Sequence, residues 1–79
     1  MELIPVVSSN VEAIGWEANV LLPYASMRKN ILQVKFLSGL VYNYLNVPKE
    51  VYVELMASDS KGSYINRKIK NKYTCLKGD

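Results

Sequence analysis

Apolar and polar residues alternate most clearly between positions 31 and 37. The apolar side of this segment is formed by Leu32, Val34 and Phe36. Gln33 and Lys35 stand between them, and such alternation is typical of a strand with one buried face. Ser38 and Gly39 then predict a turn, and residues 40–47 predict a returning strand, so that the two strands form a hairpin.

The N-terminal half predicts further strand structure. Residues 11–16 are mostly apolar and follow the polar Ser8-Ser9-Asn10, which favours a strand. Residues 18–30 contain Pro23 and mix polar with apolar positions, so we expect a loop there, with room for a short strand at residues 20–22.

The turn at Ser38-Gly39 decides which way two tyrosines point. A two-residue loop would put Tyr42 and Tyr44 on the polar side and Asn43 in the core. A three-residue loop with a bulge reverses this and leaves Asn43 in solvent. A buried asparagine without partners costs about 1–3 kcal/mol, so we favour the bulged hairpin.

After the hairpin the apolar spacing becomes helical. Pro48 suits a helix start, and residues 51, 52, 55 and 56 follow at helical spacing, with Gly62 expected as the residue that closes the helix. A second helix is expected from Ser63, with Ile65, Ile69 and Tyr73 on one face and Ser60 or Ser63 as its N-cap. We expect residues 75–79 to be a flexible tail.

The expected fold is therefore α+β, a small antiparallel β-meander of three or four strands followed by two C-terminal helices packed on one face. The 79 residues and the hydrophobic fraction of 49% fit one domain over residues 1–79, with a core spanning about 6–74. No apolar run is long enough to span a membrane, and the first residues lack the pattern of a signal peptide. We expect a cytoplasmic protein with no membrane partner.

Charge is distributed unevenly. Residues 61–79 hold six basic residues and one acidic residue, whereas residues 1–60 hold four basic and six acidic residues. A basic end on a near-neutral body favours an anionic partner, although a solvated helix face that keeps the protein soluble would give the same pattern.

The spacing of several short motifs resembles that of the KTSC domain, a small domain named after the C-terminal segment of some lysyl-tRNA synthetases and also found as stand-alone bacterial and phage proteins. The matching positions are Ser8-Ser9, Gly15-Trp16, Leu32-x-Val34-x-Phe36, Gly39, Tyr42-x-Tyr44, Val47-Pro48, Ala57, Ser60, Gly62, Tyr64, Asn66, Ile69 and Tyr73. Trp16 stands where the family usually has tyrosine, and the segment between Trp16 and Ile31 is longer than usual. The resemblance implies RNA binding and supplies no catalytic residues.

The chain offers little for catalysis. It contains no histidine, and its single cysteine, Cys75, can form neither an internal disulfide nor a Cys/His zinc site. No motif places a base beside Cys75 or a serine. We therefore expect no enzyme activity, no catalytic residues, no metal and no cofactor.

Binding is better supported by the residue types in the second half. The candidate ligand-binding residues are Trp16, Tyr42, Tyr44, Ser60, Tyr64, Asn66, Arg67, Lys68, Lys70 and Lys72. The basic residues can neutralise phosphates and the aromatic rings can stack on bases, although the tyrosines fit equally well as core residues with a polar tip.

The sequence predicts a non-catalytic binding module for an anionic nucleotide-type ligand, with RNA or single-stranded nucleic acid first among the candidates. One alternative is a phage-type protein that sequesters a small nucleotide signal. Another is a protein-interaction or homo-oligomerisation module that uses a sheet edge or the 18–30 segment.

Overall fold

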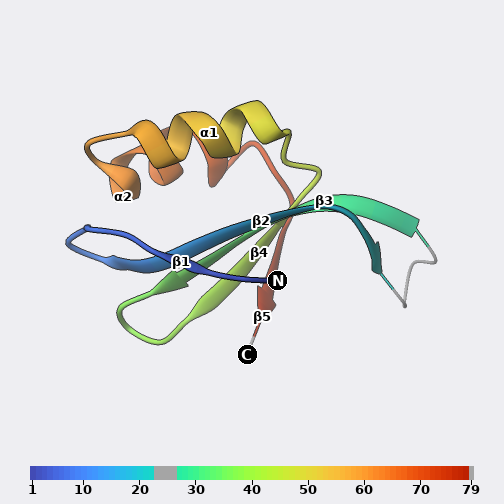
Figure 1. The fold of residues 1–79 in the computed structure, drawn as a ribbon, viewed down its shortest axis with the longest axis horizontal. Coiled ribbons are helices and arrows are strands. Elements are labelled where there is room, and N and C mark those ends of the chain that lie inside the picture. The colour runs from blue at the N-terminus through green and yellow to red at the C-terminus, as the bar shows by residue number, and fades with distance from the viewer. Residues whose placement is uncertain (23–26, 79) are drawn as a thin grey trace.

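The computed structural model describes residues 1–22 and 27–78 and shows a five-stranded antiparallel sheet with its helices on one side (Figure 1). The strands lie in the order β1-β2-β3-β4-β5. The elements are β1 (Ile4–Pro5), β2 (Val11–Leu22), β3 (Met27–Phe36), β4 (Val41–Leu45), α1 (Lys49–Ala57), α2 (Lys61–Tyr64), η1 (Ile65–Ile69) and β5 (Cys75–Gly78). The predicted α+β class is confirmed, and the predicted count of three or four strands is wrong.

The fifth strand is the segment that the sequence predicted to be a flexible tail. Residues 75–78 return from the helical layer and pair antiparallel with β4, with Tyr44 opposite Cys75 and Asn43 opposite Leu76. This pairing satisfies backbone groups on the outer edge of β4. The tail was mispredicted because its pairing partner lies some thirty positions earlier in the chain, where no local pattern reveals it.

The segment predicted as a loop at 18–30 is largely strand. β2 continues to Leu22 and β3 begins at Met27, and these two residues lie opposite each other. The predicted short strand at 20–22 is thus the end of β2, while Pro23 lies outside the described residues. A bulge between Glu17 and Val20, with Asn19 at φ 60°, interrupts the pairing. Since β4 pairs only with residues 31–35 of β3, this end of β2 and β3 extends beyond the sheet as an arm (Figure 1).

The bulged β3–β4 hairpin is confirmed. The Phe36 amide donates to the Leu40 carbonyl at 2.9 Å, which encloses a three-residue loop. Gly39 closes the loop at φ 96°, a conformation that favours glycine. Tyr42 consequently pairs with Val34, and Tyr44 lies opposite Leu32, with both rings on the side of the helices.

The helical layer differs from the prediction in where its helices begin and end. α1 ends at Ala57, and Ser58 is already extended at φ −72° and ψ 139°. Gly62, expected as the residue that closes this helix, lies instead within α2. The second helical segment begins at Lys61 and widens into the π-helical turn η1, where the Lys70 amide donates to the Ile65 carbonyl at 2.8 Å.

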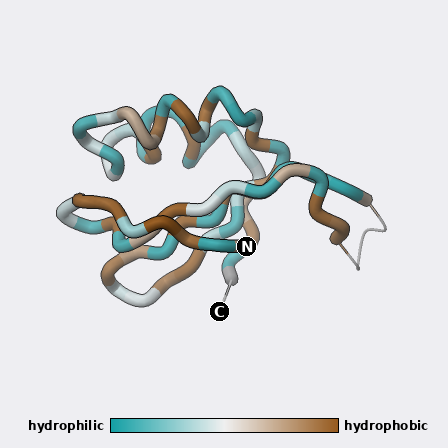
Figure 2. Tube along the Cα trace, viewed as in Figure 1, coloured by the Kyte–Doolittle hydropathy of each residue, from teal (hydrophilic) through white to brown (hydrophobic). Residues whose placement is uncertain are grey.

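A single hydrophobic core fills the space between the sheet and the helices. Its buried members are Val11, Ile14, Leu32, Val34, Tyr44, Val47, Leu55, Tyr64, Ile65 and Ile69. The predicted apolar stripe of the second helix is confirmed, since Ile65 and Ile69 are buried and Tyr73 packs against the core. Figure 2 shows the alternation of hydrophobic and hydrophilic positions along the strands and helices that produces this layer. The core therefore holds the second helix at a fixed place over β3 and β4.

The hairpin geometry predicts the effect of replacing its glycine. The substitution Gly39→Ala should destabilise the protein by about 1 kcal/mol, because a Cβ atom is disfavoured at positive φ. No steric clash contributes, since nothing lies within 4 Å of the added atom. The difference can be measured by urea unfolding, with Ser38→Ala as the control in the same loop. Equal stabilities of the two variants would contradict this account of the turn.

Candidate functional site

The principal cavity of the described residues lies where the β3–β4 hairpin faces the second helical segment. It has a volume of about 820 Å³. Three aromatic side chains from neighbouring strands form one wall. The ring of Phe36 meets that of Tyr42 edge to face at 5.4 Å, and Tyr42 meets Tyr44 in the same way at 6.4 Å. Their alternation along β3 and β4 places all three on the side of the helices.

The opposite wall comes from the second helical segment. Ile65 provides an apolar contact, whereas Asn66 and Lys70 provide an amide and an ammonium group. Ile65 and Ile69 are buried in the core and fix the rotation of this segment. Asn66 and Lys70, which are both exposed, are thereby held at the rim of the cavity.

The third side of the cavity is the turn between β1 and β2. The Ser8 hydroxyl accepts hydrogen bonds from the amides of Asn10 and Val11 at 3.3 and 3.2 Å, which shapes this turn. The Asn10 carbonyl accepts from the Leu37 amide at 2.9 Å, so that the turn and the hairpin loop are joined. A Cβ atom on Gly62 would clash with the Asn10 side chain, and glycine therefore allows α2 to lie directly on the turn.

Tyr44 forms the deepest part of the aromatic wall, with 3% of its surface exposed. Burial raises the pKa of its hydroxyl to about 12, and the neighbouring Cys75 and Tyr42 contribute in the same direction. The Tyr44 hydroxyl is therefore neutral near pH 7. Among the side chains that line the cavity, Lys70 alone carries a charge at this pH, so the cavity combines aromatic surface with one cation.

The remaining predicted cations gather on another side of the second helical segment. A second hollow of about 340 Å³ is lined by Val51, Glu54, Tyr64, Arg67, Lys68, Asn71, Lys72 and Tyr73. The Lys72 ammonium group lies 5.9 Å from the centre of the Tyr73 ring. The ion pairs of the described residues involve other groups, and Glu54 is the acidic side chain that lines this hollow with the cations.

Tyr64 lies at the back of this second hollow with its ring in the core. Only 6% of its surface is exposed, and its hydroxyl donates to a Glu54 carboxylate oxygen at 2.6 Å. Burial raises the pKa of Tyr64 to about 12, and the hydrogen bond to Glu54 adds to the effect. Since its faces are covered, the ring is not available to stack on a base, and its role is to join α2 to α1.

Two other candidate residues lie apart from the cavity. The indole N–H of Trp16 donates to the Val47 carbonyl at 2.8 Å, and its ring stacks on Tyr52 with centroids 6.2 Å apart. Trp16 thus fastens β2 to the start of α1. Ser60 lies in a polar hollow of about 290 Å³ beside the β1–β2 turn, where its predicted N-cap position is confirmed but its side chain makes no capping hydrogen bond.

The structure therefore divides the ten candidates among several places. Tyr42, Tyr44, Asn66 and Lys70 meet in the principal cavity. Sequence reasoning missed Phe36, Ser9 and Asn10, which also line it. The alternation of β3 placed Phe36 on the same side as the tyrosines and could have revealed it. Nothing local to Ser9 and Asn10 indicates that their turn meets the second helix.

The cavity thus places three aromatic rings beside an amide and an ammonium group. Within residues 1–22 and 27–78, no three metal-ligating side chains of the His, Cys, Asp or Glu type cluster together. The described helices include none with the length and apolarity needed to cross a bilayer.

The fold and cavity define a two-layer α+β domain with a ligand-sized recess at the junction of its layers. The KTSC domain model matches residues 7–73, and the chain belongs to the KTSC domain family. A protein of Tsukamurella paurometabola is 33% identical over 72 residues, covering 91% of this chain and 94% of the relative. A protein of Stutzerimonas stutzeri is 31% identical over 70 residues, covering 89% and 86%.

A solved structure shares the same architecture. The crystal structure of a KTSC domain protein from Yersinia pestis matches with a TM-score of 0.77 and 30% identity, covering 99% of this chain and 97% of the other. The resemblance inferred from the sequence is thereby confirmed at the level of both family and fold.

The raised pKa of Tyr64 predicts how stability depends on pH. An unfolded tyrosine ionises near pH 10, whereas folded Tyr64 ionises at about 12. The stabilisation is fully present below pH 10 and is lost as the pH rises through 12. The free energy of unfolding of the wild type should therefore fall relative to that of Tyr64→Phe over this range.

Urea unfolding of both proteins at a series of pH values measures this difference. In Glu54→Gln, which keeps a hydrogen-bond acceptor without the charge, the fall should be smaller than in the wild type. If wild type and Tyr64→Phe keep a constant difference in stability from pH 10 to 12, the pKa of Tyr64 is not raised in the folded protein.

Proposed function

We propose that this protein is a non-catalytic binding module for single-stranded nucleic acid, with RNA as the leading ligand. In this proposal one base enters the cavity against the aromatic wall, and the adjacent phosphate is bound by Lys70. The main observation in support of this proposal is that one cavity is lined by three aromatic rings together with an amide and an ammonium group. The rings belong to Phe36, Tyr42 and Tyr44, and the polar groups to Asn66 and Lys70. Bases of any sequence present an aromatic face, and stacking on a side chain contributes about 1–3 kcal/mol per base.

The amide groups at the rim supply a means of base recognition. Asn66 and Asn10 each carry a donor and an acceptor and lie on different sides of the cavity. Such groups can hydrogen-bond the edge of an unpaired base, which is how proteins read single-stranded RNA. A paired base would keep these edges hidden, so the proposal specifies single strands.

The second hollow supports a ligand longer than one nucleotide. Arg67, Lys68 and Lys72 lie on the side of the helical segment that faces away from Lys70, and a mononucleotide in the cavity would leave them unused. A continuous strand that crosses this segment can place phosphates on both sides. The same three residues make binding sensitive to salt, because each phosphate contact releases condensed counterions.

A small nucleotide signal is the second candidate ligand. The cavity volume of about 820 Å³ lies within the range of small-molecule sites, and the cavity by itself offers both ring and anion contacts. In this case the protein would sequester the nucleotide, and the cations of the second hollow would contribute little. Mass spectrometry of material released from the purified, denatured protein tells a bound nucleotide from carried-over RNA.

The role of Lys70 can be tested with a labelled single-stranded RNA of about 12 nucleotides, long enough to span one small domain. Lys70→Ala should weaken binding about fivefold to tenfold and lower the salt slope by about 0.7, the value for one phosphate contact on a single strand. Lys49→Ala, at the exposed start of α1, removes the same charge away from the cavity and is the matched control. Fluorescence anisotropy at several salt concentrations measures both quantities. Equal losses of affinity in the two variants would show that Lys70 acts only through the overall charge of the protein and not through a phosphate contact at the cavity.

The aromatic wall has its own matched pair of variants. Tyr42→Leu should weaken RNA binding by about tenfold, because an aliphatic side chain keeps the packing but cannot stack. Tyr52→Leu removes a half-buried ring that stacks on Trp16 outside the cavity, and should leave the affinity unchanged. Anisotropy titrations together with thermal melts separate loss of binding from loss of structure. Unchanged affinity of a folded Tyr42→Leu protein would refute the proposed place of the base.

A further inference from the structure

The polar hollow beside the β1–β2 turn adjoins the aromatic cavity and shares one wall with it. The hollow has a volume of about 290 Å³, and the residues common to both spaces are Ser9, Asn10, Gly62 and Ser63. They come from the β1–β2 turn and from α2, which face each other in Figure 1. A group attached to a ring in the cavity can therefore reach into the hollow.

The charges that line the polar hollow balance, unlike those of the two neighbouring spaces. The residues that line the hollow and not the cavity are Ser8, Asp59, Ser60 and Lys61. Asp59 supplies one carboxylate and Lys61 one ammonium group, and this ammonium group donates to the Ser58 carbonyl at 2.8 Å. A phosphate in the hollow would meet the Asp59 carboxylate, a like charge that costs binding energy. The hollow therefore suits an uncharged group that carries hydroxyls.

The loop between α1 and α2 presents hydrogen-bonding groups that the molecule itself does not use. The Ser58 hydroxyl accepts from the Ser60 amide at 3.1 Å and donates to the Ser60 carbonyl at 3.2 Å, which shapes this loop. Among the described residues, no hydrogen bond or ion pair involves the Asp59 carboxylate or the Ser60 hydroxyl. A carboxylate and a hydroxyl are thus both available to a ligand in the polar hollow.

We propose that the polar hollow is a subsite for the ribose of the bound nucleotide, in which Asp59 accepts a hydrogen bond from the 2′-hydroxyl. A carboxylate performs this task in dinucleotide-binding sites, where it accepts from a ribose hydroxyl. The 2′-hydroxyl is also the group by which a protein distinguishes RNA from DNA. Because the subsite serves a base bound in the cavity, it rests on the proposed function and adds to it a preference for RNA.

The path of the ligand backbone is consistent with the place of Lys70. Ser63 and Lys70 line the cavity from one helical segment and are seven positions, or about 10 Å, apart. A backbone that follows this rim can place its phosphate at Lys70 and its sugar toward the hollow, while the base points into the cavity. Sugar, base and phosphate then each meet groups of matching chemistry.

The subsite can be tested with the same labelled RNA and with DNA of the same sequence that contains deoxyuridine, so that the bases are identical. The wild type should bind RNA about tenfold more tightly than DNA, as expected for one hydrogen bond to a charged group. Asp59→Ala should weaken RNA binding about tenfold and leave DNA binding unchanged. Loss of a carboxylate would otherwise strengthen binding of an anion, so the two explanations predict opposite directions. Fluorescence anisotropy measures all four affinities.

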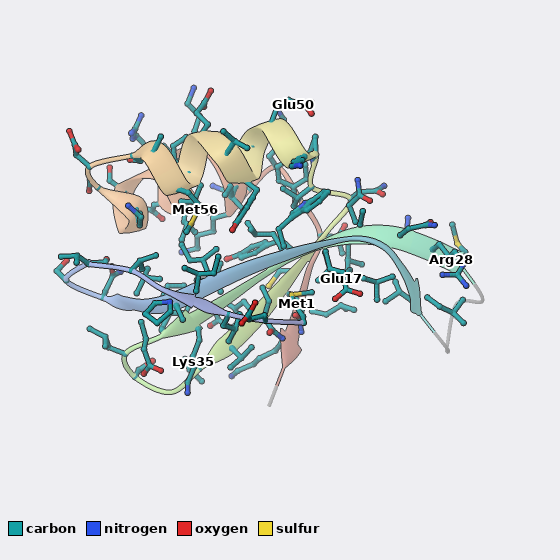
Figure 3. The ribbon with its side chains drawn as sticks, viewed as in Figure 1. Met1, Glu17, Arg28, Lys35, Glu50 and Met56 are labelled. Atoms are coloured by element: carbon teal, nitrogen blue, oxygen red, sulfur yellow. The ribbon has the colours of Figure 1, made fainter. Side chains whose placement is uncertain are left out.

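Glu50→Ala is the matched control for the lost charge. Glu50 lies in the first turn of α1, at the opposite end of this helix from Asp59, and Figure 3 shows it on the side away from the sheet. This variant should keep the wild-type preference for RNA. RNA with 2′-fluoro sugars keeps the RNA sugar conformation but has no hydroxyl to donate, so the wild type should bind it as weakly as DNA.

The results separate the subsite from the function on which it rests. Equal affinities of the wild type for RNA and DNA would overturn the subsite, as would a folded Asp59→Ala protein that keeps the wild-type preference. If Tyr42→Leu still weakens binding of both strands in that case, the proposed function stands. Binding of neither strand would overturn both. Competition with AMP and 2′-deoxy-AMP identifies the source of the ribose, because a free ribonucleotide that uses the subsite displaces RNA at a lower concentration than its deoxy form.

Discussion

The backbone conformation of Gly39 is the constraint on which the other features depend. Because side chains alternate along a strand, one extra residue in the hairpin loop exchanges the two faces of β4. The three-residue loop puts Tyr42 and Tyr44 toward the helices and Asn43 away from them. A two-residue loop would instead bury the Asn43 amide and expose two aromatic rings. Burying the amide without a partner alone costs about 1–3 kcal/mol. One residue at positive φ thus decides where the aromatic wall stands.

The second helical segment completes the cavity through two further constraints. Gly62 lets α2 lie against the Asn10 side chain beside the β1–β2 turn. The π-helical turn that follows adds one residue to the hydrogen-bonded repeat, and such turns are frequent at functional sites. With Ile65 and Ile69 anchored in the core, Lys70 is held at the cavity rim. The same anchoring directs Arg67 and Lys68 to the second hollow, which explains why one basic stretch serves two surfaces.

The features predicted from sequence are those that local chemistry determines. The alternation of residues 31–37 and the cost of burying Asn43 were enough to derive the hairpin and the side on which the tyrosines lie. The strand at 75–78 could not be derived, since its pairing depends on the free edge of β4 and not on its own pattern. Gly62 was assigned to a helix end because glycine commonly stands there, whereas its actual role depends on Asn10, a residue distant in sequence. Among the candidate site residues, Tyr64 shows the same limit. A tyrosine ring can stack on a base, but the core covers this ring, and its neighbours in the core are distant in sequence.

The alternation of Tyr42, Asn43 and Tyr44 gives β4 two different faces. The two tyrosines form the cavity wall, and the asparagine between them accepts a hydrogen bond from Gln33 on the side away from the helices. A one-residue slip of β4 would move aromatic and polar groups to the wrong sides at once, so the cavity and the amide pair place the same demand on the hairpin. The length of the loop between Phe36 and Leu40 therefore determines both surfaces of the strand.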